Sequence, residues 1–289
     1  MMALSVAQGF ETFLERLVPL ESQRDASAKH RASVETSLNN ALDVWQFREI
    51  GSFGHGTGLR GYYDVDLLVS LKNKPETSAT ALQKVKTALA ASFPSTTVRV
   101  SRPAVVVEFN GGAETWEIVP GYRKTSSGET VLYDIPGVGI VDWIDSAPME
   151  HLDYVNEVNK MTNISGGAKK LARLAKAWKY YNAVPISSFY LEMRAAKYVS
   201  GEKAFVPSED ICLYLEHLVN VDLADMNDPK GIAKRFSACS SAATKTEAKS
   251  KLNSAATRVR KAVDADKAGK TDDAFSYFDL LFGGKFPAR

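Results

Sequence analysis

Residues 51–71, GSFGHGTGLRGYYDVDLLVSL, place a glycine-rich turn directly before a strand that opens with two carboxylates, Asp64 and Asp66. Residues i and i+2 of a strand point to the same face of a sheet. The two carboxylates are therefore expected to lie close together, which is costly unless a cation lies between them. Mg²⁺ is commonly held by one or two carboxylates together with substrate phosphates. The segment predicts a metal-binding strand beside a phosphate-holding turn, and chemistry on a nucleoside triphosphate.

The composition excludes several protein classes. The chain has 289 residues, 45% of them apolar and 24% charged, as expected for one large or two modest globular domains. The near balance of 36 basic and 34 acidic residues argues against a protein dedicated to coating nucleic acid. Cys212 and Cys239 lie in no CxxC or Cys/His cluster, so a structural zinc site and a disulfide framework are not expected, and both are interpreted as buried, reduced thiols.

The chain carries no recognisable membrane or export signal. No run approaches 18 apolar residues, and the N-terminus has no basic region before its apolar stretch. We expect no membrane span, no signal peptide and a cytoplasmic location.

Strand patterns gather in the first half of the chain and helical patterns in the second. The strands expected from alternation and β-rich composition are 64–71, 104–109 and 114–119. The last two are joined by Asn110-Gly111-Gly112, a hairpin signal. The helices expected from apolar spacing are 5–18, 21–43, 77–92, 150–163, 167–182, 187–200, 208–220, 230–238, 243–266 and 271–281. Residues 120–148, rich in Pro and Gly, are expected to be loops. This pattern predicts an α+β protein, with a catalytic sheet followed by helices.

Residues 56–61, GTGLRG, match the GxGxxG fingerprint of dinucleotide-binding proteins. That fingerprint requires a strand before it and a helix that starts within it. Here the pattern before it is helical and a strand follows, and the GK[ST] ending of a P-loop is absent. We therefore predict neither a Rossmann nor a P-loop site.

A different motif fits the segment better: GS at 51–52, GT at 56–57 and DVD at 64–66. Gly51 allows the backbone to approach a phosphate closely, and the Ser52 hydroxyl can donate to phosphate oxygens. A DxD pattern by itself is common by chance, whereas the three elements in this order are more specific. The order resembles the nucleotidyltransferase signature of the DNA polymerase β superfamily.

Two-metal phosphoryl transfer usually needs a third carboxylate. No aspartate lies between Asp66 and Asp134, which leaves four glutamates, Glu76, Glu108, Glu114 and Glu117. Glu117 lies in TWEIVPG, and in the resembling family the third acid, usually aspartate, precedes such an apolar segment ending in proline. We predict Glu117 and keep Glu108 and Glu114 as alternatives. Glutamate in place of aspartate is a departure that adds one methylene of reach.

The helix expected at 167–182 carries a basic face, with Lys169, Arg173 and Lys176 at i, i+4 and i+7. A basic stripe is ordinarily a solvated face. Lysine also contacts phosphate as a point charge, and a nearby triphosphate makes that interpretation equally reasonable.

The helical half resembles the bacterial CD-NTase family, the relatives of cyclic GMP-AMP synthase and oligoadenylate synthase. The resemblance covers nearly the whole chain and rests on GSFGHGT, DVD, WEIVPG, IPGVGIVDWIDSAPMEH, LARLAKAWKYYNAVPISSFYLE and AFSYFDLLFGGKFP. It implies a polymerase β-like core with a mixed sheet and N-terminal helices at 1–150. It also implies a helical nucleotide-binding domain at 151–289, as in oligoadenylate synthase, with the active site in the cleft between the two.

The resemblance also implies residue roles. Lys176 and Ser188 are expected to contact the triphosphate, with Ser187 as the alternative serine. Gly51 and Ser52 hold the phosphates, and Asp64, Asp66 and Glu117 are the catalytic and metal-binding residues. Tyr180, Tyr181 and Tyr190 are candidates to stack on a base, although packing is the simpler interpretation of each.

The implied function is an enzyme that joins nucleoside triphosphates, ATP among them, into a cyclic di- or trinucleotide second messenger. It implies two Mg²⁺ ions (or Mn²⁺), a downstream effector protein in CBASS antiphage defence, and a regulatory partner. Zinc-dependent DNA sensing is not expected because the Cys/His cluster is absent. The alternatives are nucleotidyl transfer to a tRNA, a protein or a small molecule, and an inactive nucleotide- or RNA-binding module.

Overall fold

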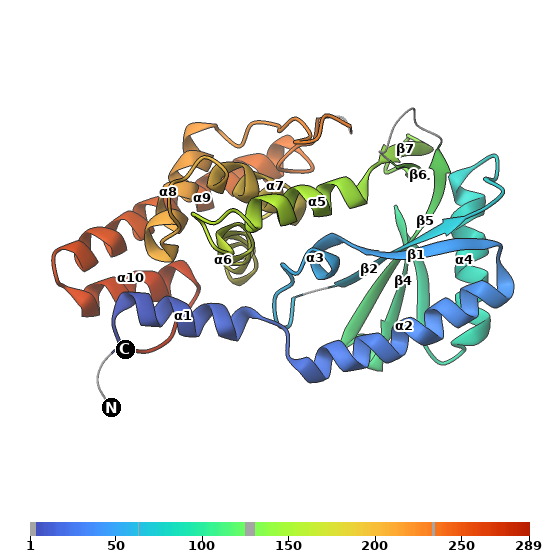
Figure 1. Ribbon diagram of the computed structural model, residues 1–289, viewed down its shortest axis with the longest axis horizontal. Helices are drawn as coiled ribbons and strands as arrows, with labels where there is room; N and C mark the ends of the chain where they lie inside the picture. Colours follow the sequence, from blue (N-terminus) through green and yellow to red (C-terminus); the bar gives the residue numbers. More distant parts are fainter. Residues whose placement is uncertain (1–3, 63, 125–130, 233–234) are drawn as a thin grey trace. The chain divides into compact units, whose positions relative to one another are not determined.

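The computed structural model describes residues 4–62, 64–124, 131–232 and 235–289 (Figure 1). The chain forms two compact units. The sheet unit is Pro19–Leu152, and the helical unit joins Met1–Val18 to Asp153–Arg289. The α+β class is confirmed, and the two units meet in sequence close to the predicted boundary at 150. The predicted domains differ at the N-terminus, because the first helix packs with the helical unit.

The sheet unit contains a mixed sheet with helices on it. Its helical elements are α2 (Glu21–Ala41), α3 (Gly51–Gly54), α4 (Ser78–Ser92) and the 3-10 turn η1 (Asn110–Gly112). Its strands are β1 (Val44–Ile50), β2 (Asp64–Leu71), β3 (Thr97–Ser101), β4 (Ala104–Phe109), β5 (Glu114–Lys124), β6 (Leu132–Pro136) and β7 (Trp143–Ser146). They pair in the order β1-β2-β5-β4-β3, and β6 pairs with both β5 and β7. The pairing of β2 with β5 is parallel, and β2 is antiparallel to β1.

Alternation along the strands decides which face each carboxylate occupies. Val65, Leu67 and Val69 of β2 lie in one buried cluster with Val34 and Leu38 of α2 and with apolar residues of α4, β4 and β5. Successive side chains of a strand point to opposite faces. The side chains of Asp64 and Asp66 therefore lie on the face opposite this core. Further along that opposite face, a second cluster of Leu68, Ala104, Val119 and Tyr133 is buried.

The helical unit consists of α1 (Val6–Leu17), α6 (Gly167–Tyr181), α7 (Ser188–Val199), α8 (Pro207–Asn220), α9 (Ala242–Lys267) and α10 (Thr271–Leu281), and α5 (Pro148–Asn159) carries the boundary with the sheet unit. Phenylalanines tie the N-terminal helix to the C-terminal end of the chain. Phe10 lies 4.8 Å from Phe278 and Phe13 lies 4.5 Å from Phe282, measured between ring centroids. Gly9 allows this approach, since a Cβ atom there would lie 2.9 Å from Phe275 Cζ. Burying such a ring contributes about 2–3 kcal/mol, which explains why α1 joins residues far away in sequence.

Four strands were not predicted from the sequence. β1, β3, β6 and β7 were not expected, and the region 120–148 expected to be loops contains the end of β5 together with β6 and β7. β3, β6 and β7 have only four or five residues, and Pro136 and nearby glycines hide the alternation in β6 and β7. The described part of 230–238 is not helical, because Met226 forms a β-bridge with Phe236. The other expected helices, and the strands at 64–71, 104–109 and 114–119, are confirmed with shifts at their ends.

In the described ranges, no helix is both long and apolar enough to cross a membrane. Cys212 is buried as expected, and Cys239 is only partly buried. Neither forms a disulfide.

Candidate functional site in the sheet unit

The glycine-rich turn begins where β1 ends, at Gly51. This residue has a φ of +60°, and a Cβ atom on it would overlap the Asp66 carboxylate. Only glycine satisfies both constraints. The turn is closed by two main-chain hydrogen bonds, from His55 N to Gly51 O and from Thr57 N to Ser52 O, both 2.9 Å long. The buried Thr57 thus holds the turn together, and Ser52 lies at the surface side of it with intermediate exposure.

The GxGxxG segment lies in a different context from the one expected. A strand, β1, does precede it, so the helical reading of that region was wrong. The one-turn helix α3 ends before Gly56, and β2 follows the segment. No helix opens within the fingerprint, and the exclusion of a Rossmann site therefore still holds.

The sheet register brings three predicted carboxylates to one face. Asp66 of β2 is paired with Glu117 of β5, and Asp64 is paired with Thr115. Residues paired in neighbouring strands share a face, and Asp64 is two residues from Asp66, so all three carboxylates lie on the same face. Asp64 is exposed, whereas Asp66 and Glu117 are half-buried.

The pKa of Glu117 depends first on its burial and then on the charges near it. Burial raises the pKa of the Glu117 carboxyl above its ordinary value, and the negative charge of Asp64 raises it further. The positive charge of Arg99 acts in the opposite direction. A carboxylate whose ionised form is disfavoured by a second carboxylate is relieved by a cation between them.

The alternative glutamates have other surroundings. Glu114 is 7% exposed and lies on the opposite face of β5, where it accepts a 2.7 Å hydrogen bond from Trp116 Nε1 and lies 2.8 Å from His30 Nδ1. Glu108 of β4 is paired with Thr115, one strand further from Asp64, and its carboxylate forms a 3.1 Å ion pair with Arg99. Glu76 follows β2 in a loop. Of the four glutamates, Glu117 is the one in register with Asp66.

The donor chemistry on this face suits a hard divalent cation. In the parts of the chain that the structure describes, no three His, Cys, Asp or Glu side chains are arranged to hold a metal ion as they stand. The three carboxylates nevertheless supply only oxygen ligands, which Mg²⁺ and Mn²⁺ prefer. Burial and then the charge of Asp64 raise the pKa of Glu117, and a bound cation would favour its ionised form.

Ser188 lies in a polar cluster of the helical unit. Lys179 Nζ donates a 2.6 Å hydrogen bond to Ser188 Oγ, and the Tyr180 hydroxyl lies 3.1 Å from the same oxygen. The alternative serine, Ser187, is the N-cap of α7, and its Oγ accepts from Tyr190 N at 3.3 Å. That role is structural. The sequence interpretation missed Lys179, although it lies one turn after Lys176 on the same helix.

Lys176 is only 2% exposed, and its ammonium forms a 3.0 Å ion pair with Glu192, which is 3% exposed. A phosphate bound by Lys176 would have to share it with this carboxylate. Lys169 of the same face is half-buried, and burial followed by the charge of Arg173 lowers its pKa. Tyr190 is fully buried and donates to Ala224 O at 2.8 Å, so packing is confirmed for this tyrosine.

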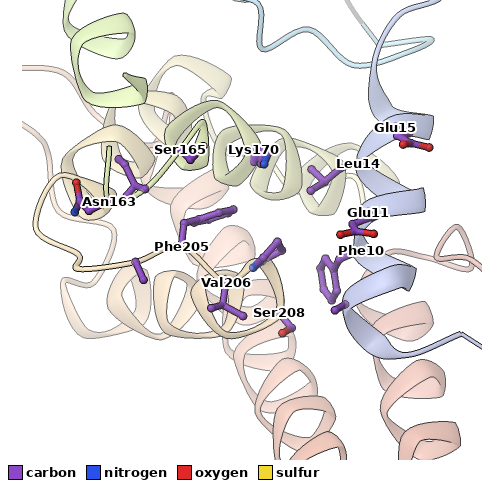
Figure 2. A pocket seen from close by; sticks show the side chains of 14 residues that line it. Phe10, Glu11, Leu14, Glu15, Asn163, Ser165, Lys170, Phe205, Val206 and Ser208 are labelled. Carbon is purple, nitrogen blue, oxygen red and sulfur yellow. The ribbon is translucent and has the colours of Figure 1, made fainter. Parts of the chain in front are cut away.

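Figure 2 shows a groove of about 530 Å³ in the helical unit, between α1 and the loops that precede α6 and α8. Phe10, Phe205 and Val206 form its apolar wall, and Glu11 of α1 and Lys170 of α6 also line it. None of the predicted site residues lines this groove.

Comparisons with known proteins agree with the geometry. The sequence profile of the Second Messenger Oligonucleotide or Dinucleotide Synthetase (SMODS) domain matches residues 4–159, more than half of the chain. No curated protein matches the sequence significantly.

Solved structures share the fold at low sequence identity. The Escherichia coli MS115-1 CdnC:HORMA-deltaN complex is 18% identical, with 98% of each chain covered and a TM-score of 0.71. A variant of the Vibrio cholerae di-nucleotide cyclase DncV with ATP, GTP and 5MTHFGLU2 is 12% identical, with 98% of this chain and 97% of that chain covered and a TM-score of 0.76. The Bradyrhizobium diazoefficiens CD-NTase CdnG with GTP is 13% identical, with 96% and 95% covered and a TM-score of 0.75. The fold is therefore a nucleotidyltransferase core with a helical domain. The chain therefore belongs to the SMODS family, whose domain is a second messenger oligonucleotide or dinucleotide synthetase.

Proposed function

We propose that this enzyme joins nucleoside triphosphates, ATP among them, into a cyclic di- or trinucleotide second messenger. The observation that carries the proposal is the register of β2 and β5, which sets Glu117 beside Asp66 with Asp64 on the same face. The Asp66 carboxylate lies against Gly51, so the phosphate-holding turn and the carboxylates are adjacent.

In this proposal the chain's own groups position the reactants. The Gly51 backbone and the Ser52 hydroxyl hold the phosphates of one nucleotide. Asp64, Asp66 and Glu117 would hold two Mg²⁺ ions, or Mn²⁺ in their place. When bound, these ions supply charge stabilisation at the α-phosphate and lower the pKa of the attacking hydroxyl.

The reaction is an in-line displacement. A ribose hydroxyl of a second nucleotide forms a bond to the α-phosphorus, the bond to pyrophosphate breaks, and the hydroxyl proton leaves. A second transfer within the linear product closes the ring. The carboxylates orient the hydroxyl, and Gly51 and Ser52 keep the phosphates aligned with it.

Lys176 and Ser188 are proposed to contact the triphosphate from the helical unit. Ser188 is supported by the adjacent ammonium of Lys179, which places a positive charge beside the serine hydroxyl. We include Lys179 in this set for that reason.

We further propose that the cyclic product acts in the cytoplasm on an effector protein in CBASS antiphage defence, and that a protein partner regulates synthesis. Support for a partner comes from CdnC, a protein of the same fold whose solved complex contains HORMA-deltaN.

The deciding experiment is incubation of the purified protein with each α-³²P-labelled nucleoside triphosphate and MgCl₂, followed by phosphatase treatment and mass spectrometry. We expect labelled products that resist phosphatase and have the mass of a cyclic di- or trinucleotide. Label on an added tRNA, protein or small-molecule acceptor would instead establish a transferase. Absence of turnover with every nucleotide mixture and added partner would indicate a binding module and contradict the proposal.

A further inference from the structure

Besides the groove in the helical unit, the sheet unit has a cavity of its own beside the glycine-rich turn. It has a volume of about 340 Å³ and is lined by Pro19, Arg24, Ala28, Arg31, Glu49, Phe53, Gly56 and Gly58. We call it the arginine pocket. None of the residues proposed for catalysis or for holding the triphosphate lines it.

Two arginines of the same helix line the arginine pocket. Arg24 and Arg31 are seven residues apart on α2, which places them on one face about 10 Å apart along the axis. Ala28 lies between them on that face. Its side chain is a single methyl group, the smallest that this position on the face could carry apart from glycine.

The charge lining the pocket is positive. Arg31 Nη1 donates to Glu49 at 2.6 Å, and Arg31 Nε donates to Glu35 at 2.7 Å. Within the described ranges, Arg24 forms no side-chain hydrogen bond or ion pair. The lining therefore presents two guanidiniums and one carboxylate, Glu49, to a ligand.

The rest of the lining is apolar or backbone. Phe53 and Pro19 offer ring surfaces, on which a planar heterocycle can pack. Gly56 and Gly58 have no side chain to fill the space. Pockets of about 300–1,000 Å³ are typical of small-molecule sites, and this cavity lies at the lower end of that range.

We propose that the arginine pocket binds a small aromatic phosphate of nucleoside-monophosphate size, with its phosphate on Arg24 and Arg31 and its ring against Phe53. The ligand competes with Glu49 and Glu35 for Arg31. Arginine is well suited to this role because its planar group binds phosphate in a bidentate manner.

The pocket is placed to influence the proposed active site. Glu49 precedes the turn by two residues, and a Cβ atom on Gly54 of α3 would lie 2.8 Å from the Glu49 main-chain oxygen. Displacing Arg31 from Glu49 therefore acts on the segment that carries Gly51 and Ser52. This regulatory consequence rests on the proposed function, whereas ligand binding does not.

The test is calorimetric titration of the full-length protein with AMP, inorganic phosphate and adenosine in EDTA, which removes the metal ions that the substrate site is proposed to need. We expect saturable AMP binding that is stronger than binding of either fragment. Arg24→Ala should weaken it by about tenfold, since it removes a charge-assisted hydrogen bond. The matched control Arg48→Ala, an exposed arginine on β1 outside the lining, should leave binding unchanged.

A variant that is expected to strengthen AMP binding distinguishes a direct contact from a loss of structure. Glu49→Gln removes the charge of one of the two carboxylates that pair with Arg31 and should tighten AMP binding, whereas Ser52→Ala should leave it unchanged. No saturable binding, or weakening by Ser52→Ala and not by Arg24→Ala, would overturn the proposal. So would binding of a nucleic-acid duplex at Arg24 in place of AMP. Each result is independent of whether the protein turns over triphosphates.

Discussion

The sheet unit and the helical unit use ionisable side chains in opposite ways. Asp64, Asp66 and Glu117 lie on one face of the sheet, where burial and then the negative charge of Asp64 raise the pKa of Glu117. In the helical unit, Lys176 and Glu192 are almost fully buried, but they form an ion pair. A gathering of like charges needs a ligand to become favourable, whereas an opposite pair already neutralises itself.

The same contrast appears within one strand. Glu114 and Glu117 are both on β5, three residues apart, and therefore on opposite faces. Glu114 has His30 and Trp116 as partners, while Glu117 has Asp66 as its neighbour in register. The partner, more than the residue type, distinguishes the structural glutamate from the candidate metal ligand.

The largest expected effect is on turnover, from Asp66→Asn. It keeps the shape of the side chain but removes its charge, and we expect nucleotidyl transfer to fall by about a thousandfold or more. Product formation from labelled triphosphates measures it, with thermal unfolding as the check on folding. Glu108→Gln, on the same sheet face but paired with Arg99, is the control and should retain turnover. Full activity of Asp66→Asn would refute the metal site.

Breaking the buried pair in the helical unit should cost stability. Lys176→Met leaves the Glu192 carboxylate buried without this partner, and we expect a loss of about 3–5 kcal/mol in the free energy of unfolding. Urea denaturation measures it. The double variant Lys176→Met/Glu192→Leu should regain most of the loss.

Turnover of the double variant Lys176→Met/Glu192→Leu tests whether Lys176 also contacts the triphosphate. Restored stability with restored turnover would show that Lys176 is structural only. Restored stability with a raised KM for the triphosphate would support the proposed phosphate contact of Lys176.

The next effect concerns the phenylalanine cluster. Phe10→Ala removes a ring that contacts Phe278 and Phe286, and we expect about 3 kcal/mol of lost stability. The control is Leu280→Ala on α10, where the side chain is 54% exposed and the loss should be small. Equal melting temperatures for the two variants would show that α1 does not stabilise the helical unit.

A smaller loss is expected from the opposite face of β5. Glu114→Ala removes an acceptor from Trp116 Nε1 and from His30, and an orphaned buried donor costs about 1–3 kcal/mol. Denaturant titration measures the loss. Turnover at a temperature where the variant is folded should match the parent, and a thousandfold loss there would place Glu114 in the active site.

The smallest effect is a difference in thiol reactivity within the helical unit. Burial raises the pKa of the Cys212 thiol to about 12, and Cys239 is only partly buried. The thiolate is the reactive form, so at pH 8 a thiol reagent should label Cys239 first and Cys212 only after unfolding. Equal rates at the two positions in the native protein would contradict this burial.

The local sequence determined much of the fold and part of the candidate site. The segment from Gly51 to Asp66 and the strand at Asp64–Leu71 were predicted because turn chemistry and alternation are local properties. The short strands β3, β6 and β7 were not, since a few residues around prolines and glycines carry too weak a pattern to outweigh a loop.

Which side chains meet one another depends on the tertiary structure. Register sets Glu117 beside Asp66 and turns Glu114 away, ring packing assigns α1 to the helical unit, and an ion pair occupies Lys176. These facts depend on residues that are distant in sequence. A sequence states which groups are present and how they repeat, whereas hydrogen bonding between strands and close packing between helices determine which groups meet.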